Sequence, residues 1–226
     1  MSVVTPAERS TWRETDPYVL GHGRGGSVPY ATGHGEGGPA SKRVVVGFGF
    51  WIFLLSDIVI FSCFFASYAV LARETASGPS AKDLFDLGNT ALQTGFLLAS
   101  TFVCGLASLA VDLRNQKWTQ VTLLVTGLLG LGFLVLEVRE FAEFMSRGAG
   151  PSRSAFLSAF FTLVGSHGLH VTVGLLWLGT MMAQFLAKGF RQDIRHRFLC
   201  FSLFWHTLDI IWVGIFNLVF LVGTVL

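Results

Sequence analysis

The hydrophobic positions of the chain fall into five long runs that are separated by short polar segments. Each run is close to the roughly 20 residues that a helix needs to cross about 30 Å of hydrocarbon. Because backbone groups in lipid must form hydrogen bonds within their own segment, each run predicts a transmembrane helix. The expected spans are residues 44–72, 87–111, 118–136, 154–187 and 198–226, and the third helix is expected to continue through the sequence VREFAEF.

The fold class that follows is an all-α integral membrane protein with five transmembrane helices. Of the 226 residues, 52% are hydrophobic and 13% are charged. Soluble domains carry about 25% charged residues, so we expect lipid to surround most of this chain. The formal net charge of +2 is too small to indicate a nucleic-acid partner.

Residues 1–43 precede the first run and are dominated by Gly, Pro, Ser, His and charged residues. A segment of this composition cannot bury enough apolar surface to offset its ordering entropy. We therefore divide the chain into a polar, Gly-rich cytoplasmic tail, residues 1–43, and a transmembrane domain, residues 44–226. The tail does not have the pattern of a signal peptide, so the first hydrophobic run is expected to direct insertion.

The distribution of Lys and Arg indicates the orientation of the chain in the membrane. They are more frequent in the tail and in the segments around residues 114–117 and 188–197 than in the other two connections. Positively charged connections favour the cytoplasmic side. The pattern predicts a cytoplasmic N-terminus and a periplasmic C-terminus.

Asp57 lies near the centre of the first predicted span. Its helical face is expected to be lined by aromatic side chains, namely Phe50, Phe53, Phe61, Phe64 and Tyr68. A carboxylate in that setting would lack solvation, so we expect Asp57 to be protonated. Two interpretations remain open: a proton-linked carboxyl, or a neutral acid that forms a hydrogen bond to another helix.

Other polar residues inside the predicted spans are expected to form an interhelical polar seam, because lipid offers them no partners. The seam comprises His167 and His170 in the fourth span and Ser202, His206, Asp209 and Asn217 in the fifth. A metal site built from the three histidines is the weaker alternative, since a haem–copper centre needs more histidines and the cysteines are scattered. We therefore expect no catalytic residue, no cofactor and no metal in this chain.

Three acids follow the third hydrophobic run at intervals of three residues: Glu137, Glu140 and Glu143. We expect them at the outer interface of the membrane, solvated or bonded to lipid headgroups and neighbouring loops. A cation site on the outer surface is the alternative.

Four segments resemble the signatures of one family, subunit III of the haem–copper oxidases. They are GFWIFLLSDIVIFSCFFASY, LEVREFAEF, FFTLVGSHGLHV and FWHTLDIIW, and they occur in the family's order within residues 44–226. The acid of the family's first shared helix falls on Asp57, where mitochondrial-type subunits carry Glu. The five-span form with a short polar tail is most similar to subunit III of bacterial bo-type (cytochrome o) ubiquinol oxidases.

The resemblance implies an accessory subunit that docks directly on oxidase subunit I, which holds the haems and copper, in a complex that also contains subunits II and IV. That complex oxidises ubiquinol, reduces oxygen to water and pumps protons. Subunit III supports assembly, binds phospholipid and sustains proton uptake by the catalytic subunit. By the same resemblance, the first two spans would form one arm and the last three the other.

Other functions remain as alternatives. One is an accessory subunit of a cytochrome c oxidase or of a nitric-oxide reductase system. Another is an independent proton-coupled transporter that uses Asp57 and Asp209, although the chain shows no clear internal repeat and no Pro within a span. The last is a membrane metalloenzyme built on His167, His170 and His206.

Overall fold

The computed structural model describes residues 42–76, 84–189 and 192–225 of the chain. Within these residues only helices occur, and five of them are long and apolar enough to cross a membrane. The chain divides into two units, Met1–Phe48 and Gly49–Leu226, and the helices from Gly49 onward belong to the second. The tail predicted at residues 1–43 lies almost entirely outside the described residues.

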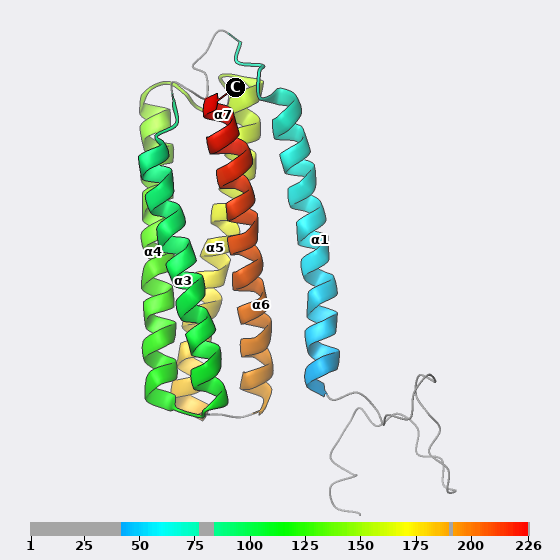
Figure 1. Cartoon of the computed structure of the whole chain (residues 1–226), viewed down its shortest axis with the longest axis vertical. Helices are drawn as coiled ribbons and strands as arrows, with labels where there is room; N and C mark the ends of the chain where they lie inside the picture. Colours follow the sequence, from blue (N-terminus) through cyan, green and yellow to red (C-terminus); the bar gives the residue numbers. More distant parts are fainter. Residues whose placement is uncertain (1–41, 77–83, 190–191, 226) are drawn as a thin grey trace, which may run out of the picture. The chain divides into compact units, whose positions relative to one another are not determined.

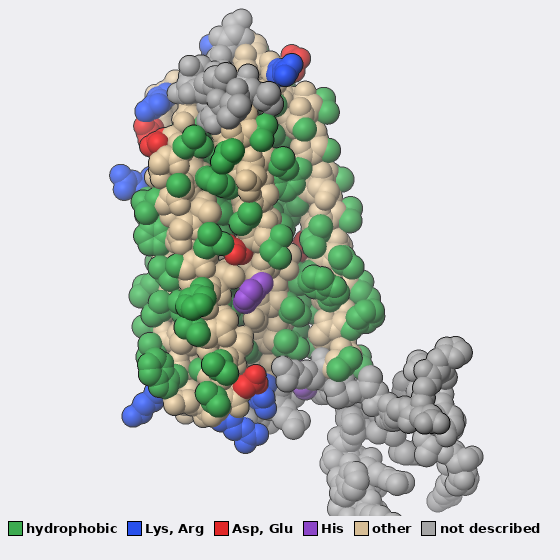
Figure 2. All heavy atoms as spheres, in the orientation of Figure 1, with side chains coloured by type: hydrophobic (Ala, Val, Ile, Leu, Met, Phe, Trp, Pro, Cys, Tyr) green, Lys and Arg blue, Asp and Glu red, His purple; other side chains and the backbone are tan. Residues whose placement is uncertain are grey.

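The helices follow the predicted spans closely, which confirms, for the described residues, the prediction of five helices long and apolar enough to cross a membrane. They are α1 (Lys42–Leu71), α3 (Leu87–Asp112), α4 (Gln116–Ser146), α5 (Ala155–Lys188) and α6 (Gln192–Ile215). A π-helical turn, η2 (Phe216–Leu221), and the short α7 (Val222–Val225) continue α6. Hydrophobic side chains cover the length of the bundle and Lys and Arg side chains lie near its ends (Figure 2).

Local sequence signals explain where these helices begin and end. The side chains of Asp86, Asn115 and Ser154 accept hydrogen bonds from the first turns of α3, α4 and α5. These are the residue types that satisfy free N–H groups at helix starts. Gly189, with a φ of 64°, ends α5 in the left-handed region, where glycine has no steric penalty.

The last span differs from its prediction in two ways. The helix starts at Gln192 rather than at residue 198, because a hydrophobic run marks only the part of a helix that lies within the hydrocarbon, and the first turns of this helix are polar. Its end changes to π-helical hydrogen bonding, in which the amide of Val222 bonds to the carbonyl of Asn217. Nothing in the hydrophobic pattern distinguishes such a turn from an α-helix.

α3 packs along α4 and also contacts α6, and these helices run side by side with α5 (Figure 1). The buried positions of α3 and α4 recur every three or four residues, as in a coiled coil. Many of them are small or polar, including Thr90, Ser100, Thr119 and Thr126. The expected division into one arm of spans 1 and 2 and another of spans 3 to 5 is therefore wrong, because span 2 (α3) packs against spans 3 and 5.

α1 contacts the rest of its unit through long side chains. Phe50 lies against Trp177 with ring centroids 5.9 Å apart, and Phe61 lies against His170 at 5.3 Å. The hydroxyl of Tyr68 donates to the carbonyl of Val219 at 3.4 Å. Most of the other apolar side chains of α1 are exposed, so lipid or other proteins must cover them.

Trp205 of α6 is held in a notch between α4 and α5. Its indole N–H donates to the hydroxyl of Ser100 at 3.0 Å, and the side chain is 2% exposed. A Cβ atom added at Gly130 or Gly174 would lie 2.8 or 2.9 Å from the indole ring. Glycine at these two positions thus permits the close approach of the helices to a large rigid ring.

We predict that Gly174→Ala destabilises the bundle by about 1–3 kcal/mol, because the added methyl group overpacks against the indole of Trp205. Gly179→Ala on the same helix is the matched control, since nothing lies within 4 Å of a Cβ atom there. The thermal midpoint of helix unfolding in detergent, measured by far-UV circular dichroism, should fall for the first variant only. Equal midpoints for the two variants would contradict the tight packing of Trp205 against Gly174.

Candidate functional site

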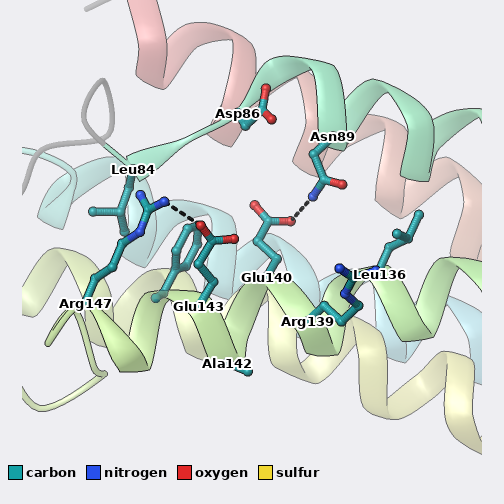
Figure 3. Close-up of a pocket in the computed structure, with 10 residues that line it drawn as sticks. Leu84, Asp86, Asn89, Leu136, Arg139, Glu140, Ala142, Glu143 and Arg147 are labelled. Carbon is teal, nitrogen blue, oxygen red and sulfur yellow. Dashed lines mark hydrogen bonds and ion pairs between the residues drawn. The ribbon is translucent and has the colours of Figure 1, made fainter.

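A pocket of about 600 Å³ lies where α3 begins and α4 ends (Figure 3). The residues that line it are mostly polar and carry charges of both signs: Leu84, Asp86, Asn89, Leu136, Arg139, Glu140, Ala142, Glu143, Phe144 and Arg147. The pocket is built by the last three turns of α4 and the first turn of α3. The polar ends of two spanning helices thus form one candidate binding site.

Glu140 is the most buried charged residue of this pocket, at 8% exposed. Its Oε2 accepts a hydrogen bond of 2.6 Å from the Gln93 side-chain amide and one of 3.3 Å from the Asn89 side-chain amide. Figure 3 shows the carboxyl pointing from α4 towards Asn89 on α3. Two amide donors from α3 therefore satisfy one oxygen of this carboxyl, without a cation.

The rim of the pocket is more exposed. Arg147 forms an ion pair with Glu143 one turn earlier in α4, and both side chains are more than half exposed. An exposed pair of this kind contributes only about 0.2–1 kcal/mol. Asp86 caps α3 by accepting a hydrogen bond of 2.9 Å from the amide of Gly88. The rim charges therefore add little stability and remain accessible to a ligand.

Glu137 lies one turn before Glu140 and is 3% exposed. It packs against α5 so closely that a Cβ atom at Gly168 would lie 2.6 Å from its Oε1. Neither carboxyl oxygen of Glu137 has a hydrogen-bond partner among the described residues. Such a group requires a proton or an internal water.

The expectation that these acids are solvated, or bonded to headgroups and loops, needs correction for Glu137 and Glu140. Both lie on the buried face of α4, which recurs every three or four residues from Thr119 to Phe144. Glu143 falls outside that face and is exposed. Extending the heptad spacing of the third hydrophobic run to its charged end would have found the two buried acids, and Gln93 falls on the corresponding face of α3.

Part of the expected polar seam joins helices. His167 is fully buried, and its Nε2 donates to the carbonyl of Leu208 at 3.2 Å, which links α5 to α6. The hydroxyl of Ser202 lies 3.5 Å from that of Ser108, which links α6 to α3. Asp209 is buried at 7% exposed and lies near Thr101 of α3 and near His206.

The other members of the seam bond to their own helices. Nδ1 of His170 donates to the carbonyl of Ser166, Nδ1 of His206 to that of Ser202, and the Asn217 amide to that of Val213, each at 2.7 Å. A carbonyl one turn earlier competes with a neighbouring helix for such side chains. Spacing along the sequence alone cannot show which partner is chosen.

The three intramembrane histidines do not converge on one point, since each bonds to a different carbonyl. Within the part of the chain that the structure describes, no group of three or more His, Cys, Asp or Glu side chains is placed to hold a metal ion. These residues therefore do not form the donor set that a metalloenzyme or a haem–copper centre requires.

Asp57 lines a second depression, a groove of about 450 Å³ between α1, α5 and α6. Its walls are largely aromatic, with Phe50 and Phe53 from α1 and Trp177 and Phe204 from the other helices. His170 faces the same groove. The Asp57 side chain is half-buried, and its carboxyl forms no hydrogen bond with another described residue.

The chain is similar to known proteins along most of its length. The pattern of the cytochrome c oxidase subunit III family matches residues 30–224. The chain is 48% identical to cytochrome bo(3) ubiquinol oxidase subunit 3 of Pseudomonas aeruginosa, over 78% of this chain and 84% of that protein. It is 39% identical to quinol oxidase subunit 3 of Bacillus subtilis, over 77% and 86%. It is 41% identical to cytochrome c oxidase subunit 3 of Bacillus sp. strain PS3, over 78% and 86%.

The family match extends over all five spanning helices, including those that carry Asp57, the buried acids of α4 and the histidines of α5 and α6. The relatives are matched over most of their own length as well. A multi-pass membrane chain with these relatives is an accessory subunit of a terminal respiratory oxidase, and the transporter and metalloenzyme alternatives are not favoured. The chain belongs to the cytochrome c oxidase subunit III family, of the bo type.

Proposed function

We propose that the chain is the third subunit of a bacterial ubiquinol oxidase, an inner-membrane complex that reduces oxygen to water and pumps protons. The observation that carries this proposal is the 48% identity to a bo(3) ubiquinol oxidase subunit 3 across 78% of the chain. A relative named for cytochrome c oxidase is 41% identical, so family membership alone does not fix the electron donor. The higher identity to the ubiquinol enzyme favours ubiquinol.

In this proposal the catalytic subunit I is the direct partner and carries the haems and copper, while subunits II and IV complete the complex. The chain contributes assembly, lipid binding and support of proton uptake rather than redox chemistry. The exposed apolar side chains of α1 offer a surface that another subunit or lipid can cover.

The complex should be isolated through a tag on this chain. We expect a haem-bearing subunit to co-purify and the complex to consume oxygen with ubiquinol at least about tenfold faster than with reduced cytochrome c, a difference of roughly 1.4 kcal/mol in the barrier. Faster turnover with reduced cytochrome c would make cytochrome c the electron donor, and the complex would still be a terminal respiratory oxidase. Nitric-oxide reduction without oxygen consumption would overturn the proposal.

We propose a cytoplasmic N-terminus and a periplasmic C-terminus. The α3–α4 connection carries Arg114 and Lys117, and α6 begins with Arg195 and Arg197. Both positions lie at the same end of the bundle (Figure 1). Positive charge near short connections retains that end in the cytoplasm.

Alkaline phosphatase fused after Leu226 should therefore be active, because that enzyme works only in the periplasm. Fusion at Asn115, in the basic α3–α4 connection, is the matched control and should be inactive, whereas fusion at Gly150 should be active. The reverse pattern at all three sites would invert the orientation.

For Asp57 we favour a structural role over a proton-carrying role, because the main proton paths are expected in the partner subunit. Asp57→Asn keeps the shape and hydrogen bonding of the side chain but cannot exchange a proton. We expect this variant to assemble and to consume oxygen within about twofold of the unmodified complex, a change of roughly 0.4 kcal/mol in the barrier. If the role is structural, Asp57→Leu should weaken assembly, because it leaves the hydrogen-bond partner of the carboxyl unsatisfied.

The control for these variants is Asp112→Asn, which removes an exposed carboxyl that does not line the groove and whose surface ion pair with Arg195 contributes only about 0.2–1 kcal/mol. Turnover about tenfold slower in a fully assembled Asp57→Asn complex would instead assign a proton-linked role.

A further inference from the structure

We propose that Glu137 and Glu140 together hold one exchangeable proton, which rests on Glu137 as a neutral carboxylic acid and reaches water through Glu140 and the pocket between α3 and α4. The end of α4 thus carries a proton-holding site. This inference does not depend on the electron donor of the complex, because it rests on side chains of this chain alone.

The two acids are neighbours on the buried face of α4. Glu137 is 3% exposed and Glu140 is 8% exposed. Side chains three residues apart on a helix have Cβ atoms about 5–6 Å from each other. Among the described residues no Lys, Arg or His side chain forms an ion pair with either acid, and α3 contains no basic residue. Two buried carboxylates at this spacing and without a cation cannot both stay ionised, so one of them holds a proton.

Hydrogen bonds decide which of the two acids is neutral. Oε2 of Glu140 accepts from the side-chain amides of Gln93 at 2.6 Å and Asn89 at 3.3 Å. N–H donors of this kind favour the ionised form of a carboxyl. Glu137 accepts no hydrogen bond from the described residues on either oxygen. The ionised form is therefore favoured at Glu140, and the proton rests on Glu137.

α5 supplies an acceptor beside the neutral acid. A Cβ atom added at Gly168 would lie 2.6 Å from Oε1 of Glu137, and His167 directly precedes that glycine. Because Nε2 of His167 donates to the carbonyl of Leu208, Nδ1 carries the lone pair of the neutral ring. Nδ1 is buried and has no partner among the described residues. This acceptor is independent of the two acids, and it also requires a proton donor at this level of the bundle.

Glu140 connects the buried acid to the pocket. Its carboxyl points from α4 towards Asn89 on α3 (Figure 3), and its Oε1 accepts no hydrogen bond from the described residues. The residue lines the pocket of about 600 Å³, which is polar and large enough for water. The other charged residues that line the pocket are Asp86, Arg139, Glu143 and Arg147.

The proton moves in two steps that conserve charge. A proton that leaves Glu137 is taken up by the Glu140 carboxylate, so that Glu137 becomes the ion and Glu140 the neutral acid. Glu140 then releases the proton to water in the pocket, and the reverse steps reload Glu137. Glu140 is suited to the second step because it is the acid of the pair that lines the pocket.

The test is infrared difference spectroscopy of the whole complex. A neutral carboxyl has a C=O stretching band that an ionised carboxylate lacks, and the band shifts when deuterium replaces the proton. Glu137→Gln removes the neutral acid, whereas Glu140→Gln interrupts the path and keeps the shape of the side chain. Glu143→Gln is the matched control, because Glu143 is an exposed acid of the same helix and pocket that lies outside the buried face.

We expect one neutral-carboxyl band of the unmodified complex to persist in the Glu143→Gln control and to be missing from Glu137→Gln. In Glu140→Gln the band should remain. Its shift after transfer into deuterated water should be at least about tenfold slower, a rise of roughly 1.4 kcal/mol in the barrier to exchange.

If Glu137→Gln fails to assemble, Glu137→Asp decides, because it keeps a carboxyl but moves it away from α5 and should move the band to a new frequency. Identical bands in the unmodified complex and in the assembled Glu137 variant would overturn the neutral state of Glu137. Exchange at the unmodified rate in Glu140→Gln would overturn the path through the pocket.

Discussion

The packing of the bundle depends on α3 finding hydrogen-bond partners on both sides in a region without water. Its Ser100 donates to the carbonyl of Thr126 on α4 at 3.2 Å and accepts from the indole of Trp205 on α6. One turn and a half earlier, Thr94 accepts from the indole of Trp212, also on α6, at 3.0 Å. Lipid cannot replace any of these partners, so the bonds fix the register of α3 against α4 and α6 together.

The same requirement explains what could be predicted from the sequence. The hydrophobic runs located all five spanning helices, because length and apolar composition are nearly sufficient for that purpose in lipid. They could not show that α3 packs on α4, since both neighbours of a spanning helix and the surrounding lipid are apolar. That information lay in the polar residues of the second span, Thr90, Gln93 and Ser100, which recur at heptad spacing.

Candidate site residues were harder to predict for a related reason. Residue type and spacing brought Glu140, His167 and Asp209 into consideration, and all three are buried. Partners were not predictable, because a polar side chain in a helix can bond either to a neighbouring helix or to a carbonyl one turn earlier. His167 bonds to a neighbouring helix, whereas His206 bonds to a carbonyl of its own helix. Glu140 accepts hydrogen bonds from Gln93 and Asn89, and both lie on α3, a helix without any basic residue.

The helices of this unit differ in how much of their surface is buried against other helices of the chain. α3, α4, α5 and α6 enclose most of the buried residues and are joined by hydrogen bonds between helices. α1 buries mainly Leu54, Phe61 and Tyr68, which recur every seven residues on one face. Its remaining apolar surface has no covering among the described residues, and the carboxyl of Asp57, at mid-length, forms no hydrogen bond with any of them. A subunit built in this way is structurally complete only when lipid or the other subunits of the oxidase cover α1.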